Sequence, residues 1–315
     1  GAVEPGDFVV TFTKNGGTAT GVTISSIKTV LSADLAGGET TLRLYLVIAG
    51  EVAGTETFSI APALNGIFDI AGNPATVTPA TPAFTIKDET GPAVINVTSD
   101  KDNGAYKAGT SIGIQVVFSE KVVVTGTPTL TLETGAVDQI INYTSGSGTN
   151  TLTFIYTVQS GDTNSVLAYQ GTTALALNDG SIKDAKNNIA TLNLPVVGAA
   201  GSLSGNKKLT IDTTAPTILS VVIDSKNEYV EITFSEGVYT TAGTGSILLT
   251  DFGLEFSSNG GTASGVTTTS ILSTAKATLV GGEKTIRIFI SVDGTVSGKE
   301  TIILKALADS IFDLA

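Results

Sequence analysis

The chain has 315 residues, with 29 acidic against 17 basic side chains and a net charge of −12. It contains no His, Cys, Met or Trp, which excludes disulfides, thiolate metal sites, His-bound zinc and the Ser-His-Asp and Cys-His catalytic arrangements. The acidic balance argues against nucleic acid as a partner, because phosphate binding needs clustered Lys and Arg, and no apolar run approaches the ~18 residues of a membrane helix.

Short strands rich in β-branched and aromatic residues follow one another along the chain. The clearest, in chain order, are predicted at 9–12, 41–47, 112–118 and 285–290. Turn-forming clusters such as Asn15–Gly17 and Ser145–Gly148 separate them. One helix-like stretch, 31–36, precedes Gly37-Gly38 and is expected to form at most one or two turns. This pattern predicts an all-β chain built of antiparallel β-sandwiches.

The chain also contains a gapless copy of itself at an offset of 244 residues. Asp7-Phe8 recurs as Asp251-Phe252, and the correspondence continues to Ile67-Phe68-Asp69, which recurs as Ile311-Phe312-Asp313. A long internal period indicates an array of modules. Residues 7–71 are called the first copy below, and residues 251–315 the second copy.

Two similar linkers divide the chain, one ending at Gly91-Pro92 and the other at Ala215-Pro216. In both, a strand is followed by an acidic residue and then by Pro, which resists continued ladder pairing. We therefore predict three sandwich modules in a tandem array, with both terminal modules incomplete. They are residues 1–90 (first type, without its opening strands), 91–214 (second type) and 215–315 (first type, without its closing strand).

The offset of the self-copy also predicts what a complete first module would contain. The third predicted module begins near Ala215, so its twin would begin about 29 residues before Gly1. We therefore expect the chain to be a window from a longer array. If the intact protein began at Gly1 and stopped at Ala315, the open sandwiches would need strands donated by a neighbouring chain.

Three sets of landmarks carry a resemblance to a known family. They are the linker Asp212–Pro216, Phe-Ser-Glu at Glu120 and at Glu236, and the Asp-x-Ala-Gly-Asn stretch Asp69–Asn73. The chain resembles bacterial immunoglobulin-like repeats of large cell-surface adhesins and S-layer-type proteins over essentially its whole length. The resemblance implies immunoglobulin-like sandwiches, secretion to the bacterial cell surface and a stalk or filament role.

The chain departs from that family pattern at three positions. Lys87 and Glu89 alter the first linker, and Lys186 stands where Gly is expected after Asp184-Ala185.

Acidic residues near the module ends form candidate calcium sites. Ca²⁺ prefers six to eight oxygen ligands at about 2.3–2.6 Å, and a linker Asp, the Glu of Phe-Ser-Glu and a late Asp could converge at one end of each sandwich. The alternative is that these are turn-forming Asp and solvent-facing Glu residues. The candidates are Asp88, Glu89, Glu120 and Asp184 for the second module (with Asp100 or Asp102 as additions), Asp212, Glu236 and Asp313 for the third, and Asp69 for the first.

These observations favour a non-enzymatic, extracellular chain. We expect the repetitive stalk or filament of a secreted bacterial surface adhesin, which gives reach and display, with Ca²⁺ and no organic cofactor. Its expected partners are neighbouring modules and other copies of the chain, without nucleic acid or membrane insertion. Two alternatives stay open: an S-layer or sheath subunit that packs laterally, or a glycan- or surface-binding module that uses loops 99–109 or 144–150.

Overall fold

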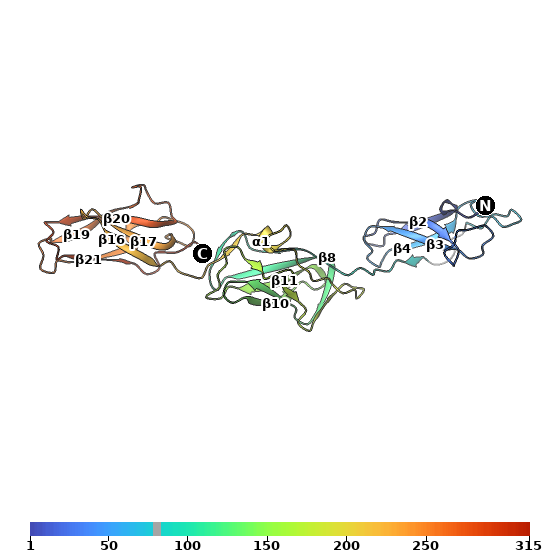
Figure 1. The fold of residues 1–315 in the computed structure, drawn as a ribbon, viewed down its shortest axis with the longest axis horizontal. Coiled ribbons are helices and arrows are strands. Elements are labelled where there is room, and N and C mark those ends of the chain that lie inside the picture. The colour runs from blue at the N-terminus through green and yellow to red at the C-terminus, as the bar shows by residue number, and fades with distance from the viewer. Residues whose placement is uncertain (78–82) are drawn as a thin grey trace. The chain divides into compact units, whose positions relative to one another are not determined.

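The computed structural model describes residues 1–77 and 83–315, and it consists of antiparallel β-sheets with very little helix (Figure 1). The prediction of an all-β chain is confirmed. The stretch 31–36 forms no helix, because Ser32 adopts a left-handed φ of 65° that breaks a helical path. A turn closes instead through a hydrogen bond of 2.9 Å from the Thr29 amide to the Ala33 carbonyl.

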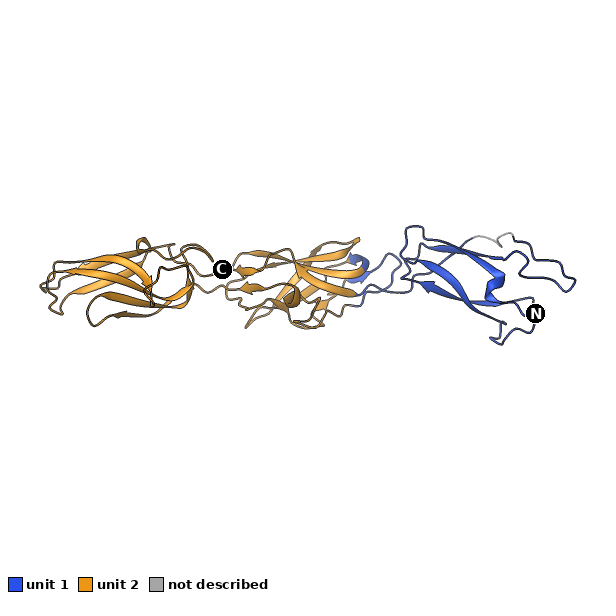
Figure 2. Ribbon diagram, turned by 90° about the horizontal axis from the view of Figure 1, so that it is seen from above, with its two compact units in different colours: residues 1–93, 120–124, 181–191 blue, residues 94–119, 125–180, 192–315 orange. Residues whose placement is uncertain are grey.

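The chain divides into two compact units, which are coloured separately in Figure 2. One contains residues 1–93, 120–124 and 181–191, and the other contains residues 94–119, 125–180 and 192–315. The three modules predicted from the sequence, residues 1–90, 91–214 and 215–315, do not coincide with these two units. The division into three modules stays a prediction.

The N-terminal strands form two small sheets, ordered β1-β4-β5 and β2-β3. Few of their side chains are buried; Val22 and Ile27 of β2 are among them. The elements are a 3₁₀ turn at Pro5–Asp7 and β1 (Phe8–Thr13), β2 (Gly21–Lys28), β3 (Arg43–Ala49), β4 (Thr57–Pro62) and β5 (Phe84–Thr85).

The middle strands form a sheet ordered β12-β9-β10-β11-β8-β14, with β6 also on β8 and β13 also on β9. Its core contains large side chains such as Phe118, Tyr156 and Tyr169. One pair departs from the antiparallel expectation, because β7 and β15 run parallel. The strands are β6 (Val94–Ser99), β7 (Gly104–Tyr106), β8 (Ser111–Thr125), β9 (Thr129–Glu133), β10 (Gln139–Ser145), β11 (Thr149–Thr157), β12 (Ala168–Tyr169), β13 (Leu175–Ala176), β14 (Ser181–Lys183) and β15 (Leu209–Ile211).

A single short α-helix occurs in the part of the chain that the structure describes. It is α1 (Leu203–Asn206), capped by the Ser202 hydroxyl, which accepts a hydrogen bond from the Gly205 amide. No helix formed by the described residues has both the length and the apolar character needed to cross a membrane.

The C-terminal strands form a four-stranded sheet ordered β16-β17-β20-β19 and a two-stranded sheet of β18 and β21. Val230, Ile232, Ile286 and Ile288 from the first sheet pack in one buried cluster with Phe252 from the second, as in a β-sandwich. The elements are β16 (Ile218–Ile223), β17 (Tyr229–Val238), a 3₁₀ turn at Leu249–Asp251, β18 (Phe252–Ser257), β19 (Gly265–Ser273), β20 (Glu283–Asp293) and β21 (Thr301–Ala306).

The two copies have the same strand pairing, residue for residue. In the first copy β1 pairs with β4 so that Phe8 lies opposite Pro62, and in the second β18 pairs with β21 so that Phe252 lies opposite Ala306. The β2–β3 and β19–β20 pairs also share their register, including one bulge between Ile24 and Ser26 and its counterpart between Thr268 and Ser270. The sequence self-copy is therefore also a copy of backbone geometry.

Each copy also contains one carboxylate that joins two of its loops. Glu56 has an exposed fraction of 0% and accepts hydrogen bonds of 2.8–3.2 Å from four backbone amides. Glu300, its counterpart, accepts from the four equivalent amides at 2.8–3.1 Å. The donors are Thr18, Ala19, Ala53 and Thr55 in the first copy and Thr262, Ala263, Ser297 and Lys299 in the second.

Candidate metal centre

Three of the predicted calcium ligands converge in one place. Asp88, Glu120 and Asp184 each present a carboxylate oxygen, and these three oxygens lie within 4.8 Å of one another. The three residues belong to the same compact unit. Asp88 follows β5, Glu120 lies in β8 and Asp184 directly follows β14. Strands distant in the sequence thus bring together the acidic group predicted for the second module.

A tight turn fixes the orientation of Asp184, which is 5% exposed. Its Oδ1 accepts hydrogen bonds from the amides of Lys186 (2.7 Å) and Asn188 (2.8 Å). The side-chain amide of Asn188 donates to Asp184 Oδ2 at 2.7 Å and to the backbone carbonyl of Asp88 at 3.1 Å. Asn188 therefore connects the linker to the turn and holds two of the three acidic residues in register.

The same turn occurs at Asp69, so it does not depend on an acidic cluster. Asp69 Oδ1 accepts from the amides of Ala71 (2.9 Å) and Asn73 (2.8 Å), and its Oδ2 accepts from the Asn73 side chain (2.9 Å). The matching hydrogen bonds of the two turns correct one expectation from the sequence. Asn187, with a φ of 72°, and not Lys186, takes the place of Gly72, whose φ is 88°. Asn tolerates this left-handed conformation better than most residues.

Glu120 is the electrostatically unfavourable member of the three. Its partial burial, followed by the negative charges of Asp88, Asp184 and Glu51, raises the pKa of Glu120 to about 7. Among the described residues, no basic side chain forms an ion pair with the Glu120 carboxylate. A cation at this point would favour the ionised carboxylate and relieve the repulsion.

No basic side chain neutralises the group within the described ranges 1–77 and 83–315, where none of the ion pairs involves Asp88, Glu120 or Asp184. Lys186 and Glu89 instead line an adjacent hollow of about 350 Å³ together with Asp88. Glu89 itself is exposed and lies outside the converging set.

The donor set matches a hard divalent cation. Three carboxylates offer up to six oxygens, and Ca²⁺ or Mg²⁺ prefers such ligands, whereas softer metals favour nitrogen or sulfur. Asp88, Glu120 and Asp184 would hold the ion. The close approach of three carboxylates without a positively charged side chain fits a bound divalent cation.

The other predicted ligands do not converge in the same way. The carboxylate of Asp69 is exposed and taken up by its own turn. Asp100 Oδ1 accepts a hydrogen bond of 2.8 Å from the Gly113 amide within its own unit. Among the described residues, neither Asp100 nor Asp102 belongs to a group of acidic side chains close enough together to bind one metal ion.

The set predicted for the third module comes together only loosely. Partial burial, followed by the charges of Asp212 and Asp313, raises the pKa of Glu236, and Lys284 opposes this effect. Asp212 Oδ1 accepts from the Thr214 amide at 3.0 Å, and Asp313 Oδ1 accepts from the Ala315 amide at 2.8 Å. In the portion of the chain that the structure describes, these three do not form a group as close as that around Glu120.

Sequence reasoning missed Glu51, Asn188 and the pair Glu56 and Glu300. Burial opposes ionisation of Glu56, but hydrogen bonds from the amides of Ala19, Ala53 and Thr55 and from its own amide prevail and lower its pKa to about 2. The self-copy offered a signal for the pair, because Glu56 recurs as Glu300. Asn188 could have been found from the alignment of Asp184–Asn188 with Asp69–Asn73.

Comparison with models of known protein families finds no match to this chain, and a search of curated proteins finds no similar sequence.

Proposed function

We propose that the chain is a non-enzymatic structural repeat region, the stalk or filament of a bacterial surface adhesin, built of immunoglobulin-like sandwiches. The observation that carries this proposal is the duplication of geometry at an offset of 244 residues: two copies share strand register, bulge and carboxylate-to-amide contacts. Repetition of a structural unit provides length, since each unit needs only its own core and its neighbours.

An extracellular location at the bacterial cell surface belongs to the same proposal. The resemblance at Asp212–Pro216 and at the two Phe-Ser-Glu sequences supports it. The net charge of −12 is compatible with a long soluble chain that repels its own copies.

We further propose that Asp88, Glu120 and Asp184 bind Ca²⁺. The ion would tie the linker segment at Asp88 to β8 and to the turn after β14, all within one unit. The convergence of three carboxylates, one with a pKa raised to about 7, supports this site.

Calorimetry with Ca²⁺ tests the metal proposal. Millimolar Ca²⁺ should raise the midpoint of thermal unfolding of the chain, EDTA should reverse the effect, and Glu120→Gln should abolish it. The matched control is Glu236→Gln, which changes the corresponding Glu in a looser group. An unchanged midpoint at millimolar Ca²⁺ would contradict the site.

Small-angle scattering tests the stalk proposal independently of the metal. A stalk segment should remain monomeric and give the scattering of a rod. Assembly into sheets or fibres would favour the S-layer or sheath alternative. Retention of a glycan on an array, lost on deletion of loop 144–150, would favour a binding module.

A further inference from the structure

The loop between β3 and β4 contacts the turn that follows β14, and both belong to one compact unit. Gly54 lies at the point of contact and has a left-handed φ of 70°. A Cβ atom added at Gly54 would lie 2.6 Å from Lys186 Cε and 3.2 Å from Asp88 Cβ. The loop can approach the turn this closely only because position 54 carries no side chain.

Glu56 fixes the shape of this loop. Its buried carboxylate accepts hydrogen bonds from the amides of Ala53 and Thr55, on either side of Gly54. The Glu56 carbonyl accepts a hydrogen bond of 2.9 Å from the Ile86 amide, which ties the loop to the start of the linker. Gly54 itself is buried. The loop therefore presents an ordered surface without a side chain to the turn.

The linker is also hydrogen-bonded to the segment that contains the turn. The Asn188 side chain, within the turn, donates to the Asp88 carbonyl at 3.1 Å. Just beyond the turn, the Thr191 amide donates to the Pro92 carbonyl at 2.7 Å. The linker is thus held by the loop at one end and by the turn segment at the other, and the contact between loop and turn closes this arrangement.

Comparison of three Asp turns shows that the turn itself does not require Lys186. The residue two positions after the Asp is Lys186 in this turn, Ala71 in the first copy and Ala315 in the second. All three amides donate to Oδ1 of the Asp, at 2.7–2.9 Å. Among the three turns, the long side chain occurs only here, and what it adds is the contact with Gly54.

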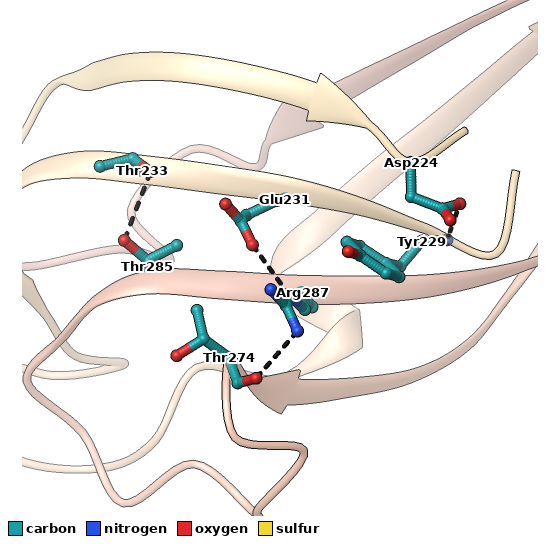
Figure 3. Close-up of polar contacts among 7 residues, drawn as sticks. All are labelled: Asp224, Tyr229, Glu231, Thr233, Thr274, Thr285 and Arg287. Carbon is teal, nitrogen blue, oxygen red and sulfur yellow. Dashed lines mark hydrogen bonds and ion pairs between the residues drawn. The ribbon is translucent and has the colours of Figure 1, made fainter. Parts of the chain in front are cut away.

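Lys186 makes this contact through its methylene groups and not through its charge. A cation held by charge looks different: Arg287 Nε donates to Glu231 Oε2 and its Nη1 donates to the Thr274 carbonyl, both at 2.8 Å (Figure 3). In the ranges that the structure describes, Lys186 forms no ion pair. Its aliphatic stem lies over Gly54 instead, as Lys stems commonly cover other groups while the charged end stays in water.

We propose that Lys186 and Asp88 form a docking surface whose occupant is the β3–β4 loop of the first copy. The surface is specific for a loop with a left-handed Gly at this position, because a Cβ atom there would collide with the Lys stem and crowd Asp88. A turn with Ala in place of Lys186 would leave the loop uncovered. Docking needs no metal ion, so it does not depend on the proposed calcium site.

Lys186→Ala tests the docking surface on the full chain in EDTA. The Asp184 turn should persist, since Ala71 occupies the same position of an equivalent turn. The Ile86 and Thr191 amides should exchange about fivefold faster, because the loop and the linker lose the contact that closes their arrangement. Lys186→Met keeps the stem without the charge and should exchange like the unmodified chain. Ala71→Lys is the matched control and should leave both amides unchanged.

Two glycine substitutions separate docking from backbone strain. Gly54 and its counterpart Gly298 have left-handed φ values of 70° and 81°, but nothing lies within 4 Å of a carbon added at Gly298. Both Gly54→Ala and Gly298→Ala should speed exchange in their own loops, at the Thr55 and Lys299 amides. Gly54→Ala should also release the Thr191 amide, which lies outside its loop, whereas Gly298→Ala should not.

Combining the two kinds of substitution gives the decisive result. Because Lys186→Ala already removes the docking surface, Gly54→Ala should speed exchange of the Thr191 amide less in that chain than in the unmodified one. Equal effects in both chains would overturn the proposal, as would exchange in Lys186→Met as fast as in Lys186→Ala. A Thr191 amide that neither single substitution affects would also contradict it, because loop and turn would then be independent.

Discussion

The carboxylates of Glu56 and Glu300 lie 244 positions apart in the chain and accept hydrogen bonds from the same four backbone positions of their respective copies. In each copy two of the donors precede the β2 or β19 strand and two precede β4 or β21. A single side chain thus satisfies amides from two loops that no ladder reaches.

Removing the Glu56 carboxylate should destabilise the first copy. Glu56→Ala leaves one buried and three partly buried amides without this acceptor, and we expect a loss on the order of 3 kcal/mol in unfolding free energy. Urea unfolding followed by hydrogen exchange in β1 and β4 measures it. Glu300→Ala is the matched variant and should affect β18 and β21 instead, with a smaller loss because Glu300 is less buried than Glu56.

Acid should weaken both copies through these two groups. Backbone hydrogen bonds from Ala263 and from its own amide lower the pKa of Glu300 to about 2, as is also found for Glu56. The unfolded carboxyls take up protons near pH 4.5, while the folded ones do so only near pH 2. Stability from this source is therefore complete above about pH 4.5 and falls as the pH drops towards 2.

Urea midpoints at pH 5.5, 4 and 3 test this pH dependence. The double variant Glu56→Gln, Glu300→Gln should show a shallower fall than the unmodified chain across that range. An equal slope in both chains would assign the acid sensitivity to other carboxylates.

Neutralising Glu120 should stabilise the chain when Ca²⁺ is absent. At pH 8 the Glu120 carboxylate is ionised against Asp88 and Asp184, and Glu120→Gln removes that repulsion. We expect the thermal midpoint in EDTA to rise by about 2 °C and the calcium response to disappear. A variant that lowered the midpoint in EDTA would show that the ionised group is favourable in the folded chain.

Gly72 and Asn187 occupy the position with a positive φ in the Asp69 and Asp184 turns, and substitutions there should differ in their effect on stability. Gly72→Ala should cost about 1 kcal/mol, because its φ of 88° disfavours a Cβ atom. Steric crowding does not contribute, since nothing lies within 4 Å of the added carbon. Asn187→Gly at the equivalent position should be tolerated, while Asn187→Val should be destabilising; denaturation curves of the three variants compare them.

The sequence was sufficient for the strand-rich class and for the duplication, because both depend on local patterns repeated many times. It also brought Asp88, Glu120 and Asp184 into one predicted group, since each belongs to a recognisable sequence landmark. The same landmarks predicted an equally close group at Asp212, Glu236 and Asp313, which the described structure lacks. Spacing along the chain shows which acidic residues lie near the same module end, but it does not determine the distances between their carboxylate oxygens.

Other features depended on contacts that no local pattern reports. A lone Glu beside a turn, such as Glu56, resembles any solvent-facing Glu until its amide donors are known. Ser32 ended the helix-like stretch 31–36 through a left-handed backbone conformation, although the surrounding residues favoured a helix. In both cases backbone geometry outweighed residue preference.

The strands β2 and β19 contain a β-bulge at the same position of the two copies. The bulge lies between Ile24 and Ser26 in β2 and between Thr268 and Ser270 in β19. In the second copy, β19 is the edge strand of its sheet and pairs with β20 on the side away from β17. A bulged edge twists away from regular pairing and discourages further strands. The same local twist therefore disfavours edge-to-edge pairing with a neighbouring chain at the bulged strand of each copy.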